Sequence, residues 1–188
     1  EDIEKLLKSG DQFGLKLMYV VQENPKGGIP EAIMLAQDFA KGEKILVLLG
    51  DNIFNFDLNS TRKKFEEMEK GAYVFGVRMP TESGQYGVIE IDTEGNVISI
   101  EEKPEQPKSD IAQTGIYMYD STVFDRIKNL SPSARGELEV TDLNNLYLKD
   151  SFLKCEIIDW WIDAGTSYDE LLRANNLVSE KLKNGELE

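Results

Sequence analysis

The sequence predicts an α/β fold, and three observations support this prediction. Short apolar runs alternate with helical patterns in the first half of the chain. Two segments of alternating apolar and polar residues follow, which predicts a β-hairpin. The composition of 188 residues, 40% hydrophobic and 30% charged, suits a single domain with a buried core.

The first half of the chain contains the alternation of strands and helices. Residues 15–22 predict a buried strand, and Pro30 suits the first position of a helix because its missing N–H costs nothing there. The apolar residues of that helix recur at helical spacing, at Ala32, Ile33, Ala36, Phe39 and Ala40. Residues 44–49 (KILVLL) are typical of a central parallel strand covered on both faces. A polar helix at about 59–70 and a strand at 72–77 continue the pattern.

In the second half, residues 86–92 and 97–102 alternate apolar and polar side chains on either side of a glycine-containing turn, which predicts the hairpin. Ser167 and Glu170 have the spacing of a capping box, so the last helix is expected to begin there. The other expected elements are a strand at 112–119 and helices at 123–129 and 141–149. No long linker is evident, so residues 1–188 are expected to form one domain.

The charge balance and the rare residue types exclude several classes of function. With 21 basic and 35 acidic residues, the net charge of −14 disfavours nucleic-acid polymers but not small phosphorylated ligands. The absence of histidine excludes Ser-His-Asp and Cys-His catalysis. The single cysteine, Cys155, fits a reducing cytoplasm, and its neighbours favour a buried structural thiol. No apolar run approaches the length of a membrane span.

Asp51 follows directly on the apolar run at 44–49. In open α/β sheets, ligands bind beyond the carboxyl ends of the strands. A carboxylate at that point suits Mg²⁺, which takes oxygen ligands alongside substrate phosphates. The same residue could instead cap the segment that follows, and its position alone leaves both interpretations open.

Asp163 also emerges from an apolar stretch, in the segment WWIDAGT. Because strand–Asp–Gly is ordinary turn chemistry as well, this residue alone indicates little. Two such carboxylates on one sheet would favour a metal site for phosphate chemistry. Asp51 and Asp163 are far apart in the sequence, so their pairing depends on the fold.

Three further segments contain candidate ligand-binding residues. Glu102 and Lys103 end the hairpin, where they form either a solvated edge or a site for sugar hydroxyls and a phosphate. Arg135 lies in a loop and is either a surface residue or a guanidinium fork for phosphate. Gly27 and Gly28 permit close approach of a ligand to the backbone, although they match neither a P-loop nor a dinucleotide-binding motif.

In order, spacing and context, these segments resemble those of the sugar-1-phosphate nucleotidyltransferases. The resemblance extends from about Gly10 to Val178 and rests on LMYVVQENPKGGIPEA, LVLLGDNIF, YGVIEID, ISIEEKP, TGIYMYD, ARGELEVTDLNN and WIDAGT. It implies a Rossmann-like nucleotide-diphospho-sugar transferase fold, with a mixed sheet, helices on both faces and a β-hairpin that contributes to sugar binding. The pattern is most like that of the members that transfer a thymidylyl group to glucose 1-phosphate.

The resemblance implies that a nucleoside triphosphate is coupled to a sugar 1-phosphate with release of pyrophosphate. It implies that Gln22 and Gly28 contact the base of the nucleotide, and that Asp51 and Asp163 hold Mg²⁺. The residues implied to bind the sugar phosphate are Asn52, Gly87, Glu102, Lys103, Gln113 and Arg135.

Three departures from the family pattern accompany this resemblance. The family often has an apolar residue where this chain has Gln113, and the GGIPEA loop makes Gly27 an alternative to Gly28. The largest departure is the absence of the family's N-terminal strand and G-x-G-T-R-L-x-P loop. In the family this segment supplies the catalytic Arg and Lys. We therefore expect this chain to be an inactive piece of an enzyme that makes dTDP-glucose from dTTP and glucose 1-phosphate. The missing first strand is expected to leave a gap in the sheet and an exposed apolar surface.

Two other functions remain open at this point. Uridylyl transfer from UTP uses contacts similar to those of thymidylyl transfer. The chain could also be a non-catalytic module that binds a sugar phosphate. Members of the family are commonly homo-oligomers, so self-association is expected in either case.

Overall fold

The computed structural model describes residues 2–79 and 83–187. The strands are β1 (Ile45–Leu48), β2 (Asn52–Phe54), β3 (Ala72–Arg78), β4 (Gly87–Ile91), β5 (Val97–Glu102), β6 (Ile111–Tyr119), β7 (Leu153–Ile158) and β8 (Trp161–Asp163). The α-helices are α1 (Asp2–Leu7), α2 (Gly28–Met34), α3 (Gln37–Ala40), α4 (Leu58–Glu67), α5 (Val123–Ile127), α6 (Val140–Lys149) and α7 (Tyr168–Lys183). Two short 3-10 helices are η1 (Asp11–Phe13) and η2 (Ser83–Gln85).

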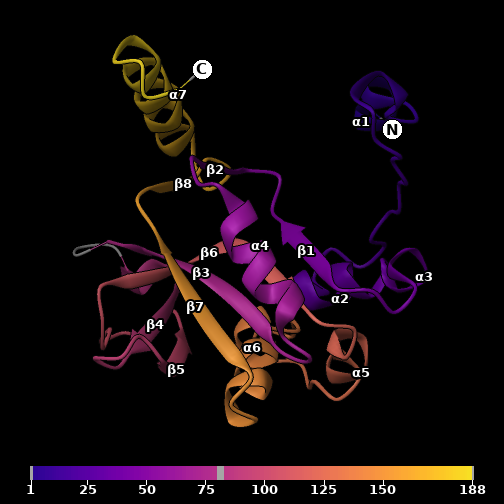
Figure 1. Cartoon of the computed structure of the whole chain (residues 1–188), viewed down its shortest axis with the longest axis vertical. Coiled ribbons are helices and arrows are strands. Elements are labelled where there is room, and N and C mark those ends of the chain that lie inside the picture. The colour runs from indigo at the N-terminus through magenta and orange to yellow at the C-terminus, as the bar shows by residue number, and fades with distance from the viewer. Residues whose placement is uncertain (1, 80–82, 188) are drawn as a thin grey trace.

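β6 is the strand around which the main sheet is built (Figure 1). One edge of β6 pairs antiparallel with β4 near Ala112 and with β1 from Ile116 to Tyr119. Its other edge pairs antiparallel with β3, which in turn pairs in parallel with β7. β5 extends the sheet as the hairpin partner of β4. The sheet is therefore mixed, as predicted, and every residue of β6 is buried.

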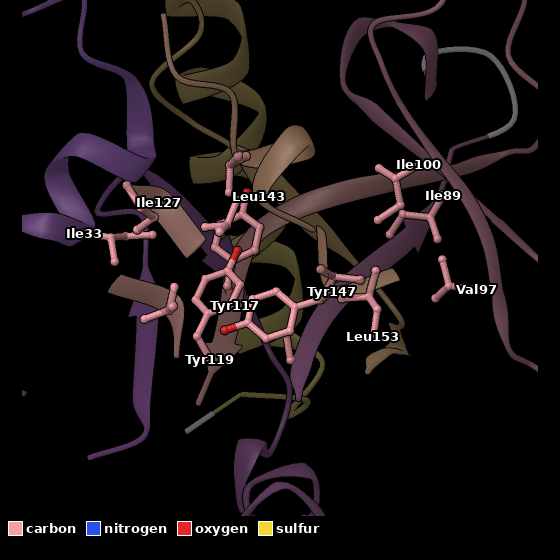
Figure 2. Close-up of a cluster of buried hydrophobic side chains, with 14 of the residues drawn as sticks. Ile33, Ile89, Val97, Ile100, Tyr117, Tyr119, Ile127, Leu143, Tyr147 and Leu153 are labelled. Carbon is pink, nitrogen blue, oxygen red and sulfur yellow. The ribbon is translucent and has the colours of Figure 1, made fainter. Parts of the chain in front are cut away.

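Helices pack on both faces of this sheet, which confirms another part of the predicted architecture. On one face, α2, α5 and α6 contribute buried side chains such as Ile33, Ile127 and Leu143 (Figure 2). On the other face, α4 packs Phe65 edge-on against Tyr73 of β3, with ring centroids 6.1 Å apart. Successive residues of β3 alternate between these two cores, as the pleat of a strand requires.

The prediction of a central parallel strand at residues 44–49 is wrong. Among the described residues β1 pairs with β6 alone, and the pairing is antiparallel. Leu46 and Leu48 are 46% and 49% exposed. The outer side of β1 and the helices α2 and α3 line a largely apolar hollow of about 920 Å³. Exposed apolar surface beside this strand agrees with the expected consequence of a missing first strand.

The strand predicted at residues 15–22 is also wrong. This segment has no regular secondary structure between η1 and α2 (Figure 1). Its apolar side chains Leu15, Met18, Val20 and Val21 are each more than half exposed. A β-strand depends on hydrogen bonds to a neighbouring strand, and no described strand lies beside this segment.

Most other predicted elements are confirmed within a few residues. The hairpin consists of β4 and β5, and Ser167 caps α7 by accepting a hydrogen bond from the backbone N–H of Glu170 over 3.1 Å. The helix expected from Pro30 is present in two pieces, α2 and α3, which are separated at Leu35 and Ala36. No strand was predicted at β7, although its first five residues, LKCEI, alternate between apolar and polar side chains.

Lys44 caps the C-terminal end of α4. Its Nζ donates to the carbonyl oxygens of Phe65 (2.8 Å), Glu66 (3.0 Å) and Met68 (2.5 Å), where the helix dipole is negative. Lys44→Met is expected to lower the free energy of unfolding by about 2 kcal/mol, the order found for charged hydrogen bonds. Denaturant unfolding measures this loss. Lys63→Met, at an exposed position of the same helix, is the control, and an equal loss in both variants would contradict the prediction.

α7 extends away from the sheet and its covering helices (Figure 1). Of its described side chains only that of Ala174 is buried, so its apolar side chains, including Leu171 and Leu172, are largely exposed. No helix in the described part of the chain combines the length and hydropathy needed to span a bilayer.

Candidate functional site

Asp51 and Asp163 are brought together by the short ladder between β2 and β8. The ladder pairs Asn52 with Asp163, and the backbone N–H of Ala164 donates to the carbonyl oxygen of Asp51 over 2.9 Å. A Cβ atom at Gly165 would lie 2.3 Å from Asp51 Oδ2, so any side chain there would displace this carboxylate. The pairing of the two acids, which the sequence left open, is decided by the fold.

Burial and the neighbouring charge of Asp51 disfavour the charged form of Asp163. The pKa of Asp163 is therefore raised above its usual range. A cation bound between the two carboxylates would remove that repulsion, and carboxylate oxygens are ligands that Mg²⁺ takes alongside phosphates. Within the described residues no third Asp, Glu, His or Cys completes a metal-binding group. The pair therefore fits an ion that is shared with substrate phosphate oxygens.

Asn52 connects these acids to the main sheet. Its Oδ1 accepts hydrogen bonds from the backbone N–H of Gly115 in β6 (2.7 Å) and from Trp161 Nε1 in β8 (2.6 Å). Its Nδ2 donates to Asp51 Oδ1 over 2.9 Å. The described hydrogen bonds of Asn52 thus orient Asp51, whereas its contact with a sugar stays a prediction.

A group of polar side chains, which we call the polar cluster, lies where β4, β5, β6 and α6 meet. Thr141 Oγ1, near the start of α6, donates to Glu102 Oε2 over 2.5 Å. A Cβ atom at Gly87 would lie 3.3 Å from both Gln113 Nε2 and Thr141 Oγ1. The structure therefore brings together Gly87, Glu102 and Gln113, three of the residues predicted to bind the sugar phosphate.

Arg135 forms ion pairs with two acids at the edge of the polar cluster, Glu102 and Glu139. Its Nη2 lies 3.4 Å from Glu102 Oε1 and 2.8 Å from Glu139 Oε2. Hydrogen bonding to Glu139 raises the pKa of Arg135. Burial raises the pKa of Glu139, but hydrogen bonds from Ser133 and Arg135 outweigh it and lower that pKa overall. About half of the Arg135 side chain (48%) stays exposed, so a ligand can reach it.

Lys103 lies within electrostatic range of both Glu139 and Asp163. Its backbone is left-handed, with φ +43°. Burial is the largest influence on the pKa of Glu139 and of Asp163, and the positive charge of Lys103 lowers both. A phosphate between the polar cluster and the acids would therefore meet this ammonium group.

One face of β6 joins the polar cluster to the acid pair. Alternation along the strand sends Gln113, Gly115 and Tyr117 to the same side of the sheet. Gln113 lies beside Gly87 in the polar cluster, and Gly115 donates to the asparagine that orients Asp51. Tyr117 lies within electrostatic range of both groups, because burial raises its pKa and the charges of Glu102 and Asp163 raise it further.

The residues predicted to contact the nucleotide base lie at the start of α2. Gln22 Nε2 donates to the carbonyl oxygen of Gly28 over 3.3 Å, and both residues line the hollow beside β1. Gly28 has φ +74°, and a Cβ atom there would lie 2.1 Å from the carbonyl oxygen of Leu138. Between Gly27 and Gly28, the latter is thus the glycine that a close backbone contact requires.

Two buried polar residues of this region were not singled out from the sequence. Thr141 and Asn144 both lie on α6, whose buried face is marked by Val140, Leu143 and Tyr147. Their position on the helix could have identified them, because a polar residue on the apolar face of a predicted helix needs a hydrogen-bonding partner. That partner lies on β5 or β6 and is invisible to local sequence patterns.

Comparisons with known proteins agree on one family. The chain matches the family model described as nucleotidyl transferase over residues 1–181. It is 42% identical over 167 residues to glucose-1-phosphate thymidylyltransferase of Neisseria gonorrhoeae, which covers 87% of this chain and 57% of that protein. It is 41% identical over 170 residues to the protein of the same name from an Actinoplanes species, which covers 88% of this chain and 55% of that one. The chain therefore spans somewhat more than half the length of these relatives.

Solved structures support the same fold. A protein from Bacillus anthracis, assigned as a glucose-1-phosphate thymidylyltransferase and solved in complex with sucrose, superimposes with a TM-score of 0.86 at 45% identity. The match covers 94% of this chain and 70% of that one. A UDP-glucose pyrophosphorylase in complex with UDP-glucose has a TM-score of 0.77 at 22% identity, covering 96% of this chain and 73% of that one, which shows a likeness of fold. The predicted nucleotidyltransferase fold is thereby confirmed.

Proposed function

This chain belongs to the nucleotidyl transferase family, and we propose that the protein it comes from transfers a thymidylyl group from dTTP to glucose 1-phosphate. Pyrophosphate is the second product. Support comes from relatives 41–42% identical that carry the name glucose-1-phosphate thymidylyltransferase.

The observation that carries this proposal is the shared face of β6. It carries Gln113, which lies beside Gly87 and Glu102, and Gly115, which donates to the asparagine that orients Asp51. A sugar bound at the polar cluster with its phosphate directed toward the acids would meet both groups at once. This is the arrangement that a reaction between a sugar phosphate and a nucleoside triphosphate needs.

In the proposed reaction, an oxygen of the sugar phosphate attacks the α-phosphorus of dTTP. A new phosphorus–oxygen bond forms, and the bond from the α-phosphorus to the oxygen bridging the β-phosphate breaks. Glu102 accepts hydrogen bonds from sugar hydroxyls, and Lys103 and Arg135 bind the sugar phosphate. Because the substrate itself is the nucleophile, the protein needs no side-chain nucleophile or histidine base, and it acts by orienting groups and neutralising charge.

We assign the magnesium ion of this reaction to Asp51 and Asp163. The closeness of the two acids across the β2–β8 ladder and the effect of the Asp51 charge on Asp163 support this assignment. Neutralisation of the phosphate oxygens is the chemistry that a bound magnesium ion would supply. Asn52 orients one of the two ligands through its hydrogen bond to Asp51 Oδ1.

We assign the nucleotide side of the site to Gln22 and Gly28, which line the hollow beside β1. An additional strand from outside this chain, paired with the outer edge of β1, would cover Leu46 and Leu48, which are about half exposed. The hollow is lined mainly by apolar side chains of α2, α3 and β1, so a strand with apolar residues at alternate positions suits it. Groups that bind the triphosphate would then reach the site from that strand's carboxyl end.

The chain by itself is expected to have negligible activity, whereas the natural full-length protein is expected to turn over. A coupled assay of pyrophosphate release with glucose 1-phosphate and Mg²⁺ measures both, with dTTP and UTP compared in parallel. Robust turnover by the chain alone would contradict the first expectation. Faster turnover with UTP than with dTTP would mean that the protein transfers a uridylyl group and not a thymidylyl group. Calorimetric binding of glucose 1-phosphate by the full-length protein without any transfer would favour a non-catalytic binding module.

Location in the cytoplasm, a homo-oligomeric state and a single-domain organisation stay predictions of the sequence. The exposed apolar residues of α7, such as Leu171 and Leu172, are available for an interface. Sedimentation analysis of the full-length protein measures its oligomeric state directly.

A further inference from the structure

One side of α7 carries apolar side chains that contact little of the described chain. Tyr168 is 92% exposed, Leu171 46% and Leu182 50%. Val178 is half-buried, and of the described side chains of the helix only that of Ala174 is buried. Figure 1 shows the helix extending away from the sheet and its covering helices. Contiguous apolar surface of this kind is typical of an interaction site.

The spacing of these residues is that of a seam between two helices. Five positions recur at alternating intervals of three and four residues, the pattern that keeps one side of a helix against a partner helix. We call them the α7 stripe: Tyr168, Leu171, Asn175, Val178 and Leu182. The central member is the polar one, and it is exposed. The stripe therefore suits a helical partner and not a flat surface.

Charged residues are kept away from the α7 stripe. At 100° per residue, five charged residues project from other sides of the helix: Asp169, Glu170, Arg173, Glu180 and Lys183. Lys181 is the one charged residue beside the stripe. Its Nζ turns back to its own chain, 2.7 Å from Glu186 Oε2 and 5.4 Å from the centroid of the Trp160 ring. Depletion of charge is the feature that distinguishes the core of an interface from the rest of a protein surface.

A second copy of this chain supplies what the centre of the stripe needs. Asn175 Nδ2 donates to the carbonyl oxygen of Leu171 over 2.8 Å, and its Oδ1 accepts no hydrogen bond from the described residues. In a parallel pair the amide of the second copy lies at the same level and provides both a donor and an acceptor. A single asparagine at such a position fixes the register of two helices, although it lowers the stability of the pair.

The arrangement of the rest of the chain permits this pair. Ala174 and Lys181 flank the stripe on the side where α7 contacts its own chain. A two-fold axis along the helices places these flanks on opposite sides of the pair, so the two copies keep clear of each other. The net charge of −14 on each chain opposes association, and salt screens that repulsion.

We propose that two copies of this protein associate through the α7 stripe as a parallel, two-fold helix pair with Asn175 at its centre. The helix has 16 residues and is therefore about 24 Å long. A contact of this length is smaller than a standard protein interface, so the dimer is weak and depends on protein concentration. Raising the salt concentration strengthens it, because the chains repel and the stripe is apolar.

Asn175→Cys in the full-length protein tests the geometry. Mild oxidation is expected to yield a covalent dimer, because the two thiols face each other across the two-fold axis. Asn176→Cys makes the same change one residue away from the stripe and is expected to yield no more dimer than the unsubstituted protein. Burial raises the pKa of the Cys155 thiol to about 12, so this residue contributes little to the background.

Sedimentation velocity from about 1 μM to about 1 mM protein measures the strength of the contact. Leu171→Glu is expected to weaken association at least about tenfold, because it places an unpaired charge in the seam. Asn176→Glu adds the same charge outside the stripe and is the control. Asn175→Leu is expected to tighten association, since the polar residue at the centre costs stability. Thermal unfolding of dilute samples checks that each variant is folded.

Three results would overturn the proposal. If Asn175→Cys forms no more covalent dimer than Asn176→Cys, the stripe is covered by something other than a second copy. If Tyr168→Cys and Leu182→Cys cross-link only when mixed, the helices are antiparallel. If Leu171→Glu associates as Asn176→Glu does, α7 is not the contact. The proposed reaction is measured separately by pyrophosphate release, so its failure would leave this interface standing.

Discussion

Asp163→Asn in the full-length protein is expected to lower kcat by about a hundredfold to a thousandfold, the order found when a charge-stabilising group is lost from a reaction centre. Asp163 pairs through its backbone with the residue next to Asp51, and together these acids form the proposed metal site. An amide keeps the shape of the side chain but removes one of two negative charges. The apparent affinity for Mg²⁺ is expected to fall along with turnover.

The same substitution is expected to stabilise the metal-free fold near neutral pH. Burial and the charge of Asp51 raise the pKa of Asp163, so the folded protein holds the proton more tightly than the unfolded chain does. Stability is therefore lost as pH rises from the ordinary aspartate pKa through the raised value of the folded state. The penalty is fully present at pH 7 and absent at pH values where both states are protonated.

Two measurements check this prediction together. Steady-state kinetics over a range of Mg²⁺ concentrations gives the activity, and thermal unfolding in chelator at pH 7 and near pH 3 gives the stability. Asp159→Asn is the matched control, because that acid lies on the same segment and is exposed. A variant of Asp163 that is both active and less stable than wild type at pH 7 would contradict the assignment.

Asn52→Ala is expected to cause the second large effect, a loss of about 3 kcal/mol in the free energy of unfolding. The backbone N–H of Gly115 and the indole N–H of Trp161 would lose their acceptor, and both lie in the interior between β6 and β8. Asp51 would lose the amide that orients it. We therefore also expect kcat to fall by roughly a hundredfold, the order associated with displacing a reaction-centre group by about 1 Å.

The control for this prediction is Asn55→Ala. Asn55 is exposed, and its hydrogen bond to the carbonyl oxygen of Glu186 is long, at 3.5 Å. Its replacement is expected to change the free energy of unfolding by less than about 0.5 kcal/mol. If Asn52→Ala were equally harmless, Asn52 would not be the connection between the acids and the sheet.

Local sequence patterns predicted an element correctly where the residues that specify it lie within that element. The hairpin of β4 and β5 followed from alternation around a glycine turn, and the start of α7 from the spacing of Ser167 and Glu170. They failed at residues 15–22 and at β1, because an apolar run does not specify which strand will pair with it. Apolar side chains of both segments, such as Val21 (78%) and Leu48 (49%), are exposed because no described strand lies on that side.

For the candidate site, the sequence by itself determined the residue types and their place at the ends of apolar runs. Asp51, Asp163 and Glu102 could be named in this way, whereas Gln113 was named only from the family resemblance. Only the tertiary structure decided that Asp51 and Asp163 are brought together by the β2–β8 ladder and that Glu102 and Gln113 lie in one polar cluster. It also decided the direction of the Gln113 amide, through a partner on α6. The physical reason is that hydrogen bonds and charges act over a few ångströms, whereas these partners are separated by long stretches of chain.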